Sequence, residues 1–170
     1  MKPIITYIAL SFLLLLSACN AQKTAGEDKI VLKTTPFKNG KETLYLLKNK
    51  TLDTATVNGS FTYQVKDNAA TDVVQYTYEK DMDKVAVDGG LREELLFEIP
   101  KGNFDLSLAN TDLQKTKMLF GRYCYCRGQN GIFTITDGHL TVTRQNDELV
   151  VTLDFHQKHI PQAFEKISSK

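Results

Sequence analysis

The sequence predicts a mainly β fold, an antiparallel barrel or sandwich of about eight to ten strands with a short C-terminal helix. Seven Tyr and nine Phe among 170 residues favour strands over helices. Apolar and polar residues alternate in several segments, and Asn-Gly and Asp-Gly pairs separate these segments as turn signals. Short strands joined by tight turns are therefore expected along most of the chain.

Turn residues divide the first part of the chain into candidate strands. Pro36 closes the first of them, and residues 44–47 fit either a strand or a helical turn. Asn58 and Gly59 readily adopt the positive φ angles of a tight hairpin turn, so the segments on either side are expected to pair. The strands predicted here are residues 30–35, 54–57 and 60–65.

The middle of the chain reads as a β meander. In residues 71–79, Val74, Tyr76 and Tyr78 fall on one face of a strand and polar residues fall on the other. Two further strands, residues 92–99 and 104–108, follow after short turns. Their inward positions are Leu95, Phe97, Ile99, Phe104, Leu106 and Leu108.

One helix is expected in the last third of the chain, and one further segment is ambiguous. Residues 110–117 fit a short capped helix or a loop. Residues 160–167 read as the closing helix, because Pro161 lies in the first turn and Phe164 and Ile167 are in helical register. Between the two, the strand signal is almost continuous.

The N-terminus follows the plan of a secretory signal. A charged start at Lys2 precedes an apolar run over residues 4–16, which is shorter than the roughly 20 residues that a transmembrane helix needs. The run ends in Leu16-Ser17-Ala18-Cys19. This ending resembles the lipobox of bacterial lipoproteins, in which Leu, a small residue, Ala and an obligatory Cys are recognised by a lipoprotein-specific peptidase.

The resemblance implies a lipid anchor on Cys19. Residues 1–18 would be removed as the signal peptide, the thiol would carry diacylglycerol, and the new amino group would take a fatty acyl chain such as palmitate. Two or three chains anchor a protein stably, at roughly 0.8 kcal/mol per buried CH2. Asn20 stands where an inner-membrane retention signal has Asp, so the resemblance implies the outer membrane, facing the periplasm. Residues 19–29 read as a lipidated flexible tether and residues 30–170 as a single β domain.

Charge and length narrow the possible partners. Removal of the signal leaves roughly 150 residues, about one domain's worth. The whole chain has 21 Lys+Arg against 20 Asp+Glu, and Lys2 is the one charged residue in the signal, so the remainder is balanced. Because such a balance provides no basic footprint, nucleic acid is not an expected partner.

Two cysteines on a predicted strand form the one cluster with metal-ligand residue types. Cys124 and Cys126 precede three histidines, His139, His156 and His159. A two-residue turn at Asp137-Gly138 would pair Phe133 with Val142, and a loop at residues 128–131 would pair Cys124 with Ile135. In this register both thiols face the core and the histidines point away from them.

The cysteine pair leaves three alternatives open. The register favours two buried, small apolar thiols. A metal-binding or thiol redox site that uses Cys124 and Cys126 is the second. A disulfide is the third, because an oxidising envelope favours it. Positions i and i+2 of a strand lie roughly 6.6 Å apart, however, so closing the bond would strain or bend the strand.

Isolated acids provide no reason to assign chemistry. Glu93, Glu94 and Asp154 have no motif around them. Asp81 and Asp83 share a loop, but the Gly and distal Glu of a calcium loop are missing at their spacing, which favours a solvated turn. The sequence therefore assigns no catalytic residue, no metal and no cofactor.

The function that these observations predict is a lipid-anchored protein of the cell envelope. Its expected partners are the membrane, through the lipid, and either a small apolar ligand or another envelope protein. Because no catalytic motif is recognised, the leading hypothesis is a non-enzymatic binding or accessory role. A metal-binding or thiol redox protein is the alternative, and a membrane-held immunity or inhibitor protein is a further one.

Overall fold

The computed structural model describes residues 29–32, 39–81, 90–146 and 148–169. It contains twelve strands in these ranges, so the prediction of a mainly β fold is confirmed, with more strands than expected. The signal peptide, Cys19 and most of the proposed tether lie outside the described residues, as does Asp83 of the candidate calcium loop.

The larger of the two main sheets has six antiparallel strands in the order β1-β2-β5-β6-β8-β9. Residues 44–47, which were ambiguous in the sequence, belong to its second strand, where Leu46 pairs with Ile30 and Val74. The strands of this sheet are β1 (Lys29–Leu32), β2 (Gly40–Leu47), β5 (Thr71–Lys80), β6 (Leu91–Pro100), β8 (Leu119–Cys124) and β9 (Gly131–Thr134).

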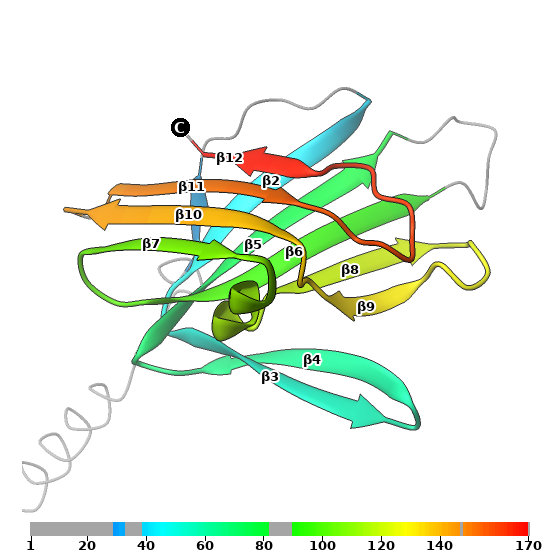
Figure 1. The fold of residues 1–170 in the computed structure, drawn as a ribbon, viewed down its shortest axis with the longest axis horizontal. Helices are drawn as coiled ribbons and strands as arrows, with labels where there is room; N and C mark the ends of the chain where they lie inside the picture. The colour runs from blue at the N-terminus through cyan, green and yellow to red at the C-terminus, as the bar shows by residue number, and fades with distance from the viewer. Residues whose placement is uncertain (1–28, 33–38, 82–89, 147, 170) are drawn as a thin grey trace, which may run out of the picture.

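The smaller sheet faces the larger one (Figure 1). Its four antiparallel strands run in the order β12-β11-β10-β7. They are β7 (Phe104–Ala109), β10 (Gly138–Gln145), β11 (Glu148–Phe155) and β12 (Lys166–Ser168). A short 3-10 helix, η2 (Asn110–Thr116), leads from the smaller sheet back to β8. Among the described strands neither sheet closes on itself, so the predicted alternative of a closed barrel is wrong.

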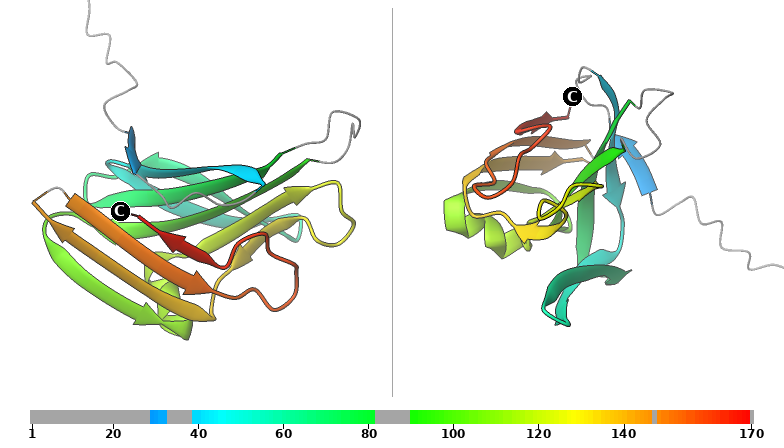
Figure 2. Two further views of the ribbon diagram at one scale, coloured as in Figure 1. Left: turned by 90° about the horizontal axis from the view of Figure 1, so that it is seen from above. Right: turned by 90° about the vertical axis from the view of Figure 1, so that its right-hand side faces the viewer.

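A separate hairpin packs on the outer face of the larger sheet. It consists of β3 (Lys50–Val57) and β4 (Ser60–Asp67), and the turn residues Asn58 and Gly59 have φ angles of 51° and 79°. The predicted hairpin is therefore confirmed, with longer strands. Leu52 of the hairpin lies in a small cluster with Val73, Leu96 and Leu119, away from the smaller sheet (Figure 2).

The main core lies between the two sheets. The predicted inward residues of β5 and β6 are all buried there, and apolar side chains of β10 and β11 meet them from the opposite sheet. Phe104, Leu106 and Leu108 of β7 are half-buried against the same core. β6 is covered on both faces, because Leu96 belongs to the cluster under the hairpin while Leu95 and Phe97 belong to the main core.

The predicted pairing around Asp137-Gly138 is wrong. β9 pairs with β8, so that Phe133 lies opposite Phe120, whereas β10 leaves for the other sheet. There Val142 lies between Leu106 of β7 and Val151 of β11. Val142 and its partners in β10 and β11 face the core, because the apolar residues of both strands alternate inward.

The predicted C-terminal helix is also wrong. Residues 156–165 run as an irregular segment that ends in β12, where Ile167 pairs with Leu153. The N–H of Ala163 donates to the Glu93 carboxylate at 2.8 Å in place of a helical carbonyl. Phe164 is buried between the sheets, and burial of this side chain outweighs the weak helical preference of the segment.

Candidate functional site

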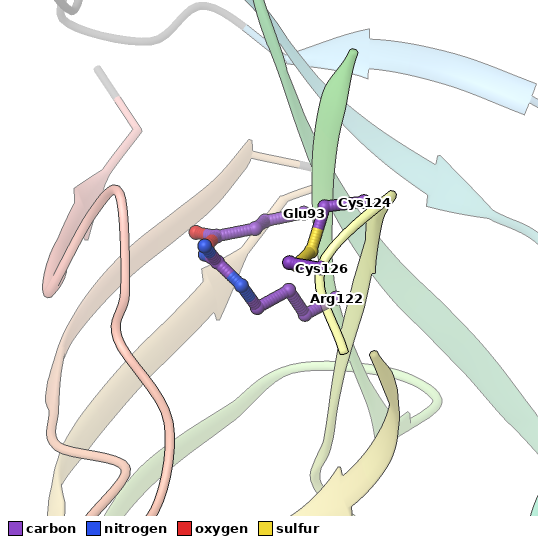
Figure 3. Close-up of a disulfide and its surroundings, with 4 residues drawn as sticks. All are labelled: Glu93, Arg122, Cys124 and Cys126. Carbon is purple, nitrogen blue, oxygen red and sulfur yellow. A yellow bond between two sulfur atoms is a disulfide. The ribbon is translucent and has the colours of Figure 1, made fainter. Parts of the chain in front are cut away.

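Cys124 and Cys126 form a disulfide at the end of β8 (Figure 3). The strand stops at Cys124 and the chain bends at Tyr125, which brings the two Cα atoms to 5.2 Å. This is inside the usual range for a disulfide and shorter than the i to i+2 spacing of a straight strand. The expected bend in the strand thus accompanies the bond.

The structure corrects the prediction of two buried free thiols. Cys124 pairs with Leu91 at the end of the β6–β8 ladder, not with Ile135, and both cysteines are half-buried. Tyr125 between them has 89% of its surface exposed. The two cysteines therefore flank an exposed residue at the end of β8.

A buried ion pair lies on the same face of the larger sheet. Arg122 precedes Cys124 by two residues, and its Nη1 donates to Oε1 of Glu93, whose side chain is fully buried. The second carboxylate oxygen accepts the N–H of Ala163. Burial raises the pKa of Glu93, and the Ala163 N–H and the Arg122 guanidinium oppose this. Among the described residues, the buried Nε of Arg122 has no hydrogen-bond acceptor.

Glu94, the next residue, points to the opposite face and is equally buried. Its carboxylate accepts hydrogen bonds from Tyr63 OH at 2.7 Å, from Tyr123 OH and from Arg92, whose guanidinium lies 4.9 Å from the Tyr123 ring centroid. Burial, and then the hydrogen bond to Glu94, raise the pKa of both tyrosines. The network fastens the β3–β4 hairpin to β6 and β8.

A groove of about 400 Å³ lies beside β9. It is lined by apolar side chains of the hairpin and of β9 and by the polar segment 156–159, which includes His156 and His159. His156 faces Glu165 at 3.8 Å, and Lys158 is paired with Asp137 at 3.3 Å. The apolar part of the lining comes from Phe61, Ile132 and Phe133.

The remaining predicted residues do not join these sites. His139 lies on the exposed face of β10, with Nε2 at 3.3 Å from Ser107 Oγ. Asp154 is exposed and paired with Lys166. Asp81 is exposed as well. Within the described ranges no group of three or more His, Cys, Asp or Glu is arranged to hold a metal ion.

The sequence contained a signal for the Glu93–Arg122 pair that register reasoning missed. Phe120, Arg122 and Cys124 are two residues apart in β8, so their side chains share its inner face. A charged residue between two inward positions is more typical of the end of a strand, so the sequence did not indicate that Arg122 is buried. The partner acid, Glu93, is followed directly by Glu94, and both are buried, on opposite faces of β6. The sequence does not show which of the two acids faces Arg122.

No protein-family model, curated protein or solved structure matches this chain. Among the residues that the structure describes, none of the helical segments has the length and apolar character that a membrane crossing requires.

Proposed function

We propose that this chain is a lipid-anchored protein of the bacterial cell envelope whose folded part, an antiparallel β sandwich, binds a protein partner and catalyses no reaction. Support for the anchor comes from the match of Leu16-Ser17-Ala18-Cys19 to the lipobox at the end of an apolar run. Acylation at Cys19 would hold the domain at the outer membrane, on the periplasmic side.

The observation that carries the choice of partner is the packing between the sheets. Among the described residues, buried side chains of both sheets pack together where a carrier of apolar ligands would need a cavity, and Phe164 from the C-terminal segment is inserted among them. The Phe164 ring lies 4.6 Å from that of Tyr76 and 5.5 Å from that of Phe155, measured between centroids. Binding to another protein at the surface fits this packing better than carriage of a small apolar molecule.

The edge of β9 is the surface best suited to such a partner. Ile135 N–H donates to the Met118 carbonyl, so hydrogen-bonded pairs alternate along the β8–β9 ladder and include Phe120 with Phe133. Ile132 lies at a non-hydrogen-bonded position, which directs its N–H and C=O away from β8. An extended segment of a partner can add to this edge at Ile132 as a further strand, with its side chains in the groove beside β9. It would displace Gln157, whose Nε2 donates to the outward carbonyl of Thr134 at 3.4 Å.

Substitution of Ile132 tests strand addition. Ile132→Pro removes the outward N–H but leaves the bonds to β8, which an edge strand tolerates. Ile132→Val keeps the N–H and is the control. A photo-crosslinking residue at Thr134, in cells, should capture one defined envelope protein with the control and not with the Pro variant. Equal capture with both variants would contradict strand addition at β9.

Labelling tests the anchor separately. Cells that express the full chain should incorporate labelled palmitate into it, and Cys19→Ser should abolish incorporation and release the protein from membranes. Ser17→Ala, which keeps a small residue, is the control. Membrane attachment that persists in Cys19→Ser would contradict the lipid anchor.

A further inference from the structure

We propose that the Cys124–Cys126 disulfide is an exchange-active redox site, which accepts two electrons from external thiols and whose opening is assisted by the Arg122 guanidinium. This inference does not depend on the proposed partner or on the lipid anchor. It rests on the place of the disulfide in the fold, on the partial exposure of its two cysteines and on Arg122, which shares the strand face of Cys124.

The disulfide is poorly placed to stabilise the fold. A crosslink restricts the unfolded chain more as the enclosed loop grows, and here one residue separates the two cysteines. β8 is already held by β6 on one side and β9 on the other, and Cys124 itself pairs with Leu91. The bond therefore adds little to stability, so its opening leaves the surrounding sheet intact.

The two cysteines lie at the partly exposed end of β8. Cys124 is the last residue of β8 and Cys126 lies in the loop beyond it, each half-buried. The intervening Tyr125 is directed to solvent, with 89% of its surface exposed. An accessible disulfide is the kind that serves as a labile or catalytic bond, whereas structural ones resist reduction.

A guanidinium lies on the same side of the strand as the disulfide. Arg122 and Cys124 share the inner face of β8, and Figure 3 shows the disulfide with Arg122 and Glu93. A cation near a cysteine stabilises its thiolate, which is the leaving group when the bond opens. Glu93 holds the guanidinium through Nη1 and leaves Nε without an acceptor among the described residues.

The exchange proceeds in two balanced steps. A thiolate of the external dithiol attacks one sulfur of the disulfide, which breaks the Cys124–Cys126 bond and forms a mixed disulfide. The released cysteine thiolate takes a proton from water. The second thiol of the external molecule loses its proton to water and attacks the external sulfur of the mixed disulfide, which breaks the bond to the other cysteine. The displaced cysteine thiolate takes a proton from water, so the external dithiol leaves oxidised and the chain retains two thiols. Two molecules of glutathione supply the same two electrons.

Equilibration with glutathione tests the proposal. The folded full-length chain in detergent is incubated with mixtures of reduced and oxidised glutathione, and free thiols are trapped by alkylation and located by peptide mass. Cys124 and Cys126 should change together from oxidised to reduced as the ratio rises, with the fold intact by circular dichroism. A pair that stays oxidised at every ratio in the folded chain, yet is reduced after unfolding in urea, would overturn the proposal.

Charge variants test the assistance by Arg122. Arg122→Gln should slow reduction by glutathione about threefold for each pKa unit by which the leaving thiol is raised. Glu93→Gln, which leaves the guanidinium charge uncompensated, should speed reduction by a similar factor. Arg92→Gln removes a guanidinium paired with a buried acid on the other face and is the matched control.

The pH dependence separates assistance from a structural effect. In the reduced chain, the pH profile of cysteine alkylation should shift in opposite directions for Arg122→Gln and Glu93→Gln, and should stay in place for Arg92→Gln. Rates and profiles that are equal in all three variants would overturn the role of Arg122. Glu93→Gln introduces a neutral residue of the same shape, so its reduction rate still tests the role of the Arg122 charge if Arg122→Gln does not fold.

Discussion

Asp72 on β5 and Arg144 on β10 form an ion pair that joins the two sheets, with Nη1 at 2.6 Å from Oδ2. Lys101 donates to the other oxygen of Asp72 at 2.6 Å, and the N–H of Asn49 reaches it at 2.9 Å. Burial of Asp72 disfavours its charge, but the hydrogen bonds from Lys101 and Arg144 outweigh this and lower its pKa. One carboxylate therefore ties both sheets and two loops together.

Asp72→Asn should destabilise the fold by about 3 kcal/mol or more, because it leaves the buried Arg144 without its charge partner. The unfolding free energy in urea measures the loss. Asp53→Asn breaks an exposed pair with Lys66, which solvent screens, and should cost much less. Equal losses in the two variants would show that the pair between the sheets is not a principal support of the fold.

Glu93 should make stability depend on pH in the opposite direction from an ordinary paired acid. Its pKa is raised in the folded state, mainly by burial, so the folded chain holds this proton to a higher pH than the unfolded chain. Stability therefore falls as pH rises from the ordinary carboxyl value to the raised one. The unfolding free energy of Glu93→Gln, measured in urea, should rise relative to that of the wild type as pH increases through this window. A difference between the two free energies that does not change with pH would contradict the raised pKa.

Phe164→Ala should cost about 3 to 5 kcal/mol of stability, because it removes a buried ring and leaves a cavity between the sheets. Thermal and urea unfolding would measure the cost. Glu165→Ala, at the exposed neighbouring position, should change stability by no more than about 0.5 kcal/mol. A small effect of Phe164→Ala would mean that the C-terminal segment detaches without consequence for the core.

Gly138→Ala should destabilise the fold by about 2 kcal/mol or more. Gly138 has φ of 150°, and an added Cβ would lie 2.8 Å from the Cα of Phe155 in β11. Gly102 also has a positive φ, 80°, but a Cβ there meets nothing within 4 Å. Gly102→Ala should therefore cost about 1 kcal/mol, and the difference between the two unfolding free energies measures the steric part.

Local signals predicted the fold best at the β3–β4 hairpin and in the β5–β6 meander, whereas the predicted pairing of Cys124 with Ile135 across the neighbouring strands β8 and β9 was wrong. Asn58-Gly59 specified its hairpin, and the inward faces of β5 and β6 were evident from alternation alone. At Asp137-Gly138 the same kind of signal failed. The segment is the crossing between the two sheets, and the pairing of β10 with the distant β7 depends on packing that no local pattern encodes.

The candidate site was only partly predictable for the same reason. Cys124 and Cys126 were evident as a pair, but their redox state depends on where β8 ends, and element boundaries are weakly encoded in sequence. The partners of the buried acids come from far along the chain: Asp72 meets Arg144, and Glu93 meets Arg122. An acid inside an apolar strand indicates a buried partner, but it does not identify the partner.

The double covering of β6 also determines how the molecule opens. Its backbone is hydrogen-bonded to β5 on one edge and β8 on the other, while the main core and the β3–β4 hairpin shield its two faces. Amide protons of β6 should then exchange with deuterated solvent only when the whole chain unfolds, whereas those at the outer edge of β9, which borders no further strand of its sheet, should exchange through small local openings. β6 is thus the last part of the protein to lose its structure.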